Sequence, residues 1–138
     1  MSRIILPATM ENLERLLGFV EACARKAGLD SKNRQRLAIA AEEAIVNVIH
    51  YAYPEEVGDI EMECARRDDA VVLVIRDWGV PFDPLKAPEP DTSQSLEERP
   101  IGGMGILLIK KMIPNLRYER KGRANQLTFR IPLASERT

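Results

Sequence analysis

The chain has 138 residues, of which 45% are apolar and 30% charged, and its formal net charge is −1. This composition is typical of a globular domain that can bury a core, and it excludes a disordered or fibrous chain. The nearly neutral charge provides no overall field towards nucleic acid or an anionic membrane, so we expect neither as a partner. No composition change marks a boundary, and we expect residues 1–138 to form one domain.

The first third of the chain predicts a strand followed by a helix. Residues 3–6 are an apolar run ended by Pro7, which is typical of an edge strand. Apolar residues at helical spacing then predict a helix that Thr9 caps and that extends to about Ala27, where Gly28 ends it. The N-terminus lacks the apolar segment of a signal peptide, and no apolar run is long enough to cross a bilayer, which predicts a cytoplasmic protein.

A second, longer helix is predicted over residues 31–52, with Asp30 or Ser31 as its cap. Its main apolar stripe is joined by a second strip formed by Ile39, Val46 and Ile49. Because two sides of the helix are apolar, we expect it to be largely buried.

The second half of the chain predicts strands interrupted by one long loop. Residues 60–64 alternate between apolar and acidic, which indicates a strand with one wet face, and residues 70–75 indicate a central strand buried on both faces. A proline-rich segment then leads to a short helix over residues 106–113 and two closing strands. Strands adjacent in sequence favour antiparallel pairs, so we expect an α+β two-layer sandwich with a mostly antiparallel sheet and helices on one face.

The two cysteines, Cys23 and Cys64, lie in apolar patterns and have no spacing typical of a metal site. We therefore expect both to be reduced core residues.

The long helix carries the first motif with chemical meaning. Glu43 and Asn47 are four residues apart and lie on one face, about one turn from each other, whereas Glu42 points away. An amide oxygen is a suitable ligand for Mg²⁺, and a neighbouring carboxylate can take a proton from an attacking hydroxyl. The alternative is that both are polar residues at the rim of the helix.

The second motif, Asp77-Trp78-Gly79-Val80-Pro81-Phe82, directly follows the buried strand. A carboxylate at a strand end can accept a hydrogen bond from the amine of adenine, and Gly79 allows the backbone to approach the ring. The alternative is a turn that an aspartate caps.

The third motif places Gly102, Gly103 and Gly105 at the start of the short helix. Glycines allow close approach of the backbone, and free N–H groups at a helix N-terminus bind phosphate oxygens. Such a glycine-rich helix start also occurs without a ligand.

Taken together and in this order, the three motifs resemble those of the Bergerat ATPases: gyrase, histidine kinases and MutL. The resemblance extends from about Leu37 to Leu133 and is nearest to bacterial anti-sigma-factor serine kinases, because Pro81-Phe82 is followed by Asp83-Pro84. It implies ATP and Mg²⁺ as cofactors.

The resemblance also implies a role for each motif residue. Glu43 would be the catalytic base, and Asn47 the Mg²⁺ ligand. Asp77 would hold the adenine amine, and Gly79 would lie beside the ring. The resemblance further implies that Gly103 and Gly105 bind the phosphates, that Thr128 contacts the nucleotide through a water, and that residues 84–99 form the ATP lid. Arg99, at the base of the lid, could meet the γ-phosphate, but an exposed loop arginine is the favoured alternative.

One departure from the family pattern concerns the end of the long helix. Relatives often have His-Ala-Tyr four residues after the asparagine, where this chain has Tyr51-Ala52-Tyr53. The single histidine, His50, has no evident partner, and we expect it at the rim of the helix.

Three functions follow from these observations. The first is a serine kinase that phosphorylates an anti-anti-sigma protein and, in another state, holds a sigma factor inactive. Because members of the family are often dimers, the resemblance also implies a possible homodimer. The second is a nucleotide-gated binding module without phosphotransfer. The third is an α+β domain in which the glycines and carboxylates are only structural.

Overall fold

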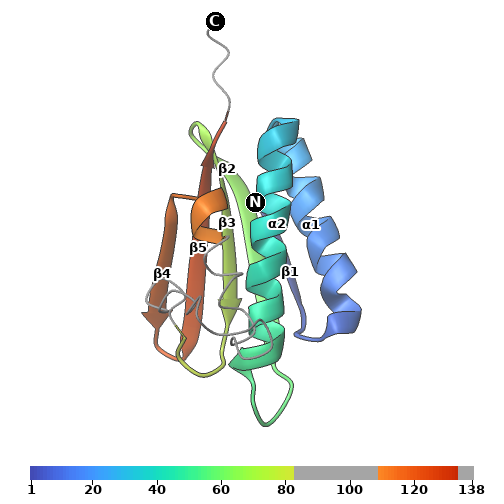
Figure 1. Cartoon of the computed structure of the whole chain (residues 1–138), viewed down its shortest axis with the longest axis vertical. Coiled ribbons are helices and arrows are strands. Elements are labelled where there is room, and N and C mark those ends of the chain that lie inside the picture. Colours follow the sequence, from blue (N-terminus) through green and yellow to red (C-terminus); the bar gives the residue numbers. More distant parts are fainter. Residues whose placement is uncertain (83–108, 134–138) are drawn as a thin grey trace, which may run out of the picture.

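The fold is a five-stranded antiparallel sheet with two helices on one face (Figure 1), seen here in a computed structural model that describes residues 1–82 and 109–133. The elements in chain order are β1 (Ser2–Pro7), the 3₁₀ turn η1 (Met10–Asn12), α1 (Leu13–Lys26), α2 (Ser31–Asn47), the π-helix η2 (Val48–Ala52), β2 (Asp59–Arg67), β3 (Ala70–Asp77), β4 (Leu116–Lys121) and β5 (Ala124–Pro132). Residues 109–112 form a helical turn.

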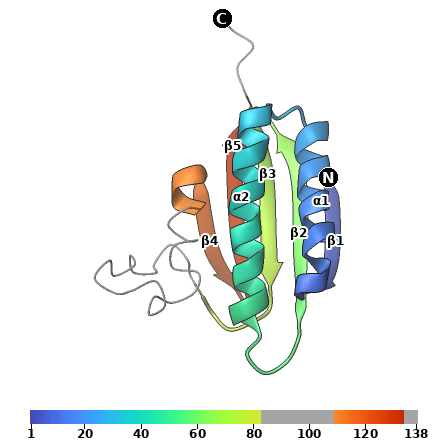
Figure 2. The same ribbon diagram turned by 45° about the vertical axis from the view of Figure 1, so that its right-hand side comes forward.

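The strands are arranged in the order β1-β2-β3-β5-β4, and each neighbouring pair is antiparallel. The helices α1 and α2 lie side by side over one face of this sheet (Figure 2). The expected two-layer α+β architecture is therefore confirmed, and so is β1 as an edge strand.

The core lies between the two layers and consists of side chains from the helices and from one face of the sheet. Its largest fully buried members include Leu16, Leu37, Ile45, Ile60, Met62, Leu73 and Phe129. These positions recur at helical spacing on α1 and α2 and alternate along the strands, because each element presents one apolar side to the other layer.

The helix α2 is less buried than its two apolar strips predict. The expected second strip is only partly covered: Ile39 is 41% exposed, and Val46 and Ile49 are half-buried. The reason is that α2 has the sheet on one side and α1 on one flank, which leaves its outer side to solvent.

The central strand β3 differs from its prediction for the same reason. Val71, Leu73 and Ile75 face the helices and are buried, whereas Val72 and Val74 face the other side of the sheet and are half-buried. Helices cover only one face, so β3 is not buried on both faces.

The helix boundaries follow local chemistry. Asp30 caps α2 by accepting a hydrogen bond from the backbone N–H of Asn33 at 3.4 Å. The chain leaves α1 through Gly28, whose φ of +89° is readily adopted only by glycine. The predicted first helix begins as the 3₁₀ turn η1, and Thr9 makes no side-chain cap bond to it.

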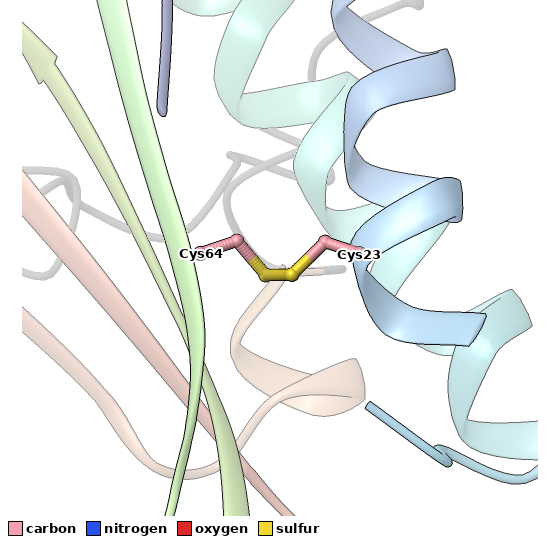
Figure 3. The surroundings of a disulfide bond; sticks show 2 residues. All are labelled: Cys23 and Cys64. Carbon is pink, nitrogen blue, oxygen red and sulfur yellow. A yellow bond between two sulfur atoms is a disulfide. The ribbon is translucent and has the colours of Figure 1, made fainter. Parts of the chain in front are cut away.

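The expectation of two reduced cysteines is wrong for this structure, because Cys23 on α1 and Cys64 on β2 form a disulfide (Figure 3). Their Cα atoms are 6.4 Å apart, which is within the range that a disulfide spans. The two residues are separated by 41 positions in sequence. Only the packing of α1 over β2 brings them together, and the sequence pattern does not contain that information.

Among the helices of residues 1–82 and 109–133, none is both long enough and apolar enough to cross a bilayer.

Candidate nucleotide site

A cavity lies where the C-terminal end of α2 and the π-helix η2 meet the ends of β3 and β5 and the middle of β4. Most of the described residues in its wall are apolar, and Asn47, Asp77 and Asn125 add polar groups together with the hydroxyls of two tyrosines. The described residues that line it are Ala44, Asn47, Val48, Tyr51, Ala52, Ile75, Asp77, Val80, Phe82, Ile109, Tyr118, Asn125 and Leu127. An apolar cavity with a few fixed polar groups is the usual form of a small-molecule site.

Asp77 is the last residue of β3 and is only 6% exposed. Its Oδ1 accepts two hydrogen bonds, both at 2.9 Å, from the backbone N–H of Gly79 and from Nδ2 of Asn125. Among the described residues, no donor bonds to Oδ2. This buried carboxylate therefore retains one oxygen that can accept a hydrogen bond from a ligand in the cavity.

The protonation of Asp77 reflects opposing influences. Burial raises the pKa of this carboxyl above its ordinary value, whereas the hydrogen bonds from Asn125 and Gly79 and the charge of Arg120 lower it. Burial is the larger influence, so the net pKa shift is upward.

Asn47 is the last residue of α2 and is 9% exposed. Its side-chain amide forms no hydrogen bond with any residue in the described part of the chain. Leaving a buried amide unpaired costs about 1–3 kcal/mol, so this group is suited to a ligand. An amide oxygen combined with phosphate oxygens and waters is a donor set that Mg²⁺ accepts.

Glu43 lies one turn before Asn47 on α2 and is half-buried. It is not among the described residues that line the cavity. The structure thus places the two motif residues on one side of α2 but brings only Asn47 into the cavity wall. Among the described residues, no cluster of three or more His, Cys, Asp or Glu side chains could hold a metal.

Gly79 is explained by packing against the end of the π-helix. A Cβ atom at this position would lie 2.1 Å from the carbonyl oxygen of Ala52, so no other residue fits without a shift. The same carbonyl accepts a hydrogen bond from the N–H of Val80 at 2.9 Å. Gly79 therefore allows the segment after β3 to dock on η2, and a contact with a nucleotide ring remains a prediction.

Tyr53 also fixes the segment after β3. It belongs to the Tyr51-Ala52-Tyr53 sequence, which differs from the family pattern. Its hydroxyl donates to the carbonyl of Asp59 at 2.6 Å and accepts from the backbone N–H of Trp78 at 2.8 Å. His50 is exposed, at the rim of η2 as expected, and its ring lies edge-on to Tyr51.

The residue that sequence reasoning missed is Asn125 on β5, which is 6% exposed and lies opposite Asp77 in the strand register. Besides Asp77 Oδ1, its Nδ2 donates to the carbonyl of Val80 at 2.8 Å. One signal was available in the sequence: Leu127, Phe129 and Ile131 alternate along β5, and Asn125 occupies the next inward position of that series. A polar residue on the inward side of an amphipathic strand requires partners.

Thr128 does not line the cavity. Asn125 and Leu127 line it from β5, and Thr128, the next residue, points to the opposite face of the sheet, where it pairs with Val74. The expected water-mediated contact from Thr128 to a nucleotide is therefore contradicted by the alternation of the strand. Asn125, three residues earlier, faces the cavity instead.

The other predicted site residues are Gly103, Gly105 and the segment 84–99 with Arg99. They lie outside the described residues, and their roles remain predictions.

Comparison with known proteins identifies the family. Residues 6–131 match the profile of the histidine kinase-like ATPase domain. The chain is 28% identical to the serine/threonine-protein kinase BtrW of Bordetella bronchiseptica, over 95% of this chain and 93% of that protein. It is 27% identical to the serine-protein kinase RsbW of Bacillus cereus, over 80% of this chain and 72% of that protein.

Two solved structures share the fold. The structure of the RsbU and RsbW domains of Rv1364c from Mycobacterium tuberculosis has a TM-score of 0.64 and 12% identity, and it covers 98% of this chain. This chain spans 33% of that longer protein. The Acinetobacter baumannii histidine kinase AdeS has a TM-score of 0.55 and 17% identity, with 98% of this chain and 70% of that chain covered.

The profile match extends over nearly the whole chain, and the fold agrees with it. The chain therefore belongs to the histidine kinase-like ATPase domain family.

Proposed function

We propose that this chain is a serine-protein kinase that binds ATP in the cavity and phosphorylates an anti-anti-sigma protein. The observation that carries the proposal is the pair of buried polar groups at this cavity: the free Oδ2 of Asp77 and the amide of Asn47. In this proposal Asp77 accepts from the exocyclic amine of adenine, which distinguishes adenine from bases without a donor there. Gly79 lies beside the ring.

Asn47 provides an amide oxygen for Mg²⁺ from the opposite wall. When bound there, Mg²⁺ would supply positive charge beside the phosphates. Gly103 and Gly105 cradle the phosphates through backbone N–H groups in the same proposal.

Glu43 takes the proton from the serine hydroxyl of the partner. The serine oxygen forms a bond to the γ-phosphorus, the bond to the β–γ bridging oxygen breaks, and ADP leaves. A carboxylate in such a role contributes about 10²–10⁴-fold to the rate.

Relatives named as serine kinases include RsbW and BtrW, at 27–28% identity. These names support the serine-kinase activity. The anti-anti-sigma substrate, the sequestration of a sigma factor in the other state and the cytoplasmic location are proposed from the resemblance of the three motifs.

One observation favours a second candidate, a nucleotide-gated binding module. Glu43 does not line the cavity in the described residues, so nucleotide could bind there and shift a partner-binding equilibrium without phosphotransfer.

The test is transfer of labelled phosphate from Mg-ATP to small anti-anti-sigma proteins of the same organism. We expect transfer by wild type and a loss of about 100-fold or more in Glu43→Gln, with ATP binding retained. Glu42→Gln is the matched control, because Glu42 is the exposed neighbour and points away. ATP binding without transfer by wild type would favour the binding module, and equal rates in wild type and Glu43→Gln would refute the base assignment.

A further inference from the structure

The buried amide of Asn125 has all of its hydrogen-bonding capacity in use. Its Nδ2 donates to Asp77 Oδ1 at 2.9 Å and to the Val80 carbonyl at 2.8 Å. Its Oδ1 accepts from the Tyr118 hydroxyl at 2.5 Å, the Arg120 guanidinium at 3.2 Å and the Phe82 N–H at 3.3 Å. A fully connected buried network of this kind holds its members in one arrangement.

The network joins parts of the chain that are distant in sequence. It links the end of β3, the segment over residues 79–82, and β4 through Arg120, which also donates to the Gly79 carbonyl at 2.9 Å. Asn125 is the common partner of these groups, and it lies on the cavity wall beside the carboxylate.

We propose that Asn125 is a positioning residue of the nucleotide site, which orients the Asp77 carboxylate so that Oδ1 is engaged and Oδ2 remains to accept from the nucleotide. This inference rests on the proposed binding of adenine at Asp77. It adds a residue that holds the acceptor in place and keeps it ionised. The expected ligand class is a nucleotide whose base carries an exocyclic amine.

The electrostatics around Asp77 support this role. Burial raises the pKa of the Asp77 carboxyl, and the hydrogen bond from Asn125 is the largest of the effects that lower it; the Gly79 N–H and the charge of Arg120 also lower it. The other ionisable groups nearby are Tyr118 on β4 and Tyr53 after η2. Loss of Asn125 would remove the largest effect that lowers this pKa and would leave the Gly79 N–H and the charge of Arg120.

The test is calorimetric titration with ADP from about pH 4 to pH 8, a range that spans ordinary and raised carboxyl pKa values. In wild type, ADP affinity is lost as pH falls and Asp77 takes a proton. Asn125→Leu keeps the branching and the number of heavy atoms of the side chain, although it is larger, and it removes both donors. We expect ADP affinity to fall about tenfold or more at neutral pH. The pH at which acidification abolishes ADP affinity should rise by about one pH unit.

A second variant, Asn125→Asp, keeps the shape of the side chain. Its carboxyl can donate to Asp77 only while it carries a proton, so ADP affinity should fall as pH rises, which wild type does not show. Thr128→Val is the control, because this residue of the same strand faces away from the cavity, and it should reproduce the wild-type profile. Circular dichroism at each pH confirms that the variants are folded.

A purely structural role would weaken ADP binding equally at every pH. The proposal is overturned if the folded Leu and Asp variants keep the pH dependence of wild type. If Asp77→Asn loses ADP binding while both Asn125 variants behave as wild type, the nucleotide site stands and only the role of Asn125 fails. If wild type binds no ADP, the proposed function fails, and this inference fails with it.

Discussion

Asp77 illustrates at the scale of one residue how a binding group differs from a stabilising one. Its carboxylate is buried, and burial raises its pKa in spite of two hydrogen bonds and a nearby arginine. A carboxyl with a raised pKa binds a proton more tightly in the folded state than in the unfolded state. The folded protein therefore loses stability as pH rises from the unfolded pKa, about 3.9, through the folded pKa.

Because ionisation of the buried carboxyl lowers the stability of the fold, we can predict the effect of Asp77→Asn. The amide is neutral and can still accept through its oxygen from Gly79 N–H and Asn125 Nδ2. At neutral pH we expect this variant to unfold at the same urea concentration as wild type or at a higher one, although its affinity for nucleotide falls. Any advantage should disappear below about pH 4, where wild-type Asp77 is protonated as well.

Urea denaturation of both proteins at neutral and acid pH measures this difference. A marked loss of stability in Asp77→Asn at neutral pH would show instead that the carboxylate stabilises the fold.

The candidate site also shows which residues a sequence can reveal. Asp77 and Asn47 are identified by motifs whose spacing is local, and the structure places both on one cavity. Asn125 is 48 residues from Asp77, and only the pairing of β3 with β5 joins them. The expectation for Thr128 selected the right strand but the wrong side, because a shift of one or three positions reverses the face.

At the scale of elements, the helices and strands were predictable from the periods of apolar residues, and local capping chemistry set their ends. Which faces would be covered was not predictable. Both apolar strips of α2 and the apolar run of β3 indicated burial on two sides, but each element has an open side because the helices form a single layer (Figure 1).

The open side of the sheet is stabilised differently. Glu61 on β2 is 4% exposed and forms ion pairs with Arg3 on β1 and Arg76 on β3. Burial alone would raise the pKa of Glu61, but the hydrogen bonds from the two arginines outweigh it and hold the pKa below its ordinary value. Charged pairs across neighbouring strands thus take the place of a second helical layer.

The disulfide between α1 and β2 supports a prediction at the same scale. Cross-linking residues 41 positions apart restricts the unfolded chain and should stabilise the fold by up to about 4 kcal/mol. A thiol reductant should therefore lower the melting temperature by about 10 °C.

The matched control is Cys23→Ser, which should melt near the temperature of the reduced wild type and should not respond to reductant. Thiol titration of the unfolded, unreduced protein tests the bond itself. Two free thiols in that titration would contradict it.

At the scale of the whole molecule, the two layers bring together one end of α2, the π-helix η2 and the ends of β3 and β5. The π-helix follows Asn47 directly, and its last carbonyl, at Ala52, receives the segment after Asp77 through Val80 N–H. Single π-helical turns are often found at functional sites, and here one ends the long helix. Two motifs 30 residues apart in sequence (77 minus 47) thus share one cavity.

The most direct test is therefore calorimetric titration with ATP, in Mg²⁺ and in EDTA, of wild type, Asn47→Ala and Asp77→Asn. We predict saturable binding by wild type that Mg²⁺ strengthens, loss of the Mg²⁺ dependence in Asn47→Ala, and a fall of about tenfold or more in affinity for Asp77→Asn. Absence of ATP binding in wild type, or equal affinity in wild type and Asp77→Asn, would contradict the assignment of this cavity as the nucleotide site.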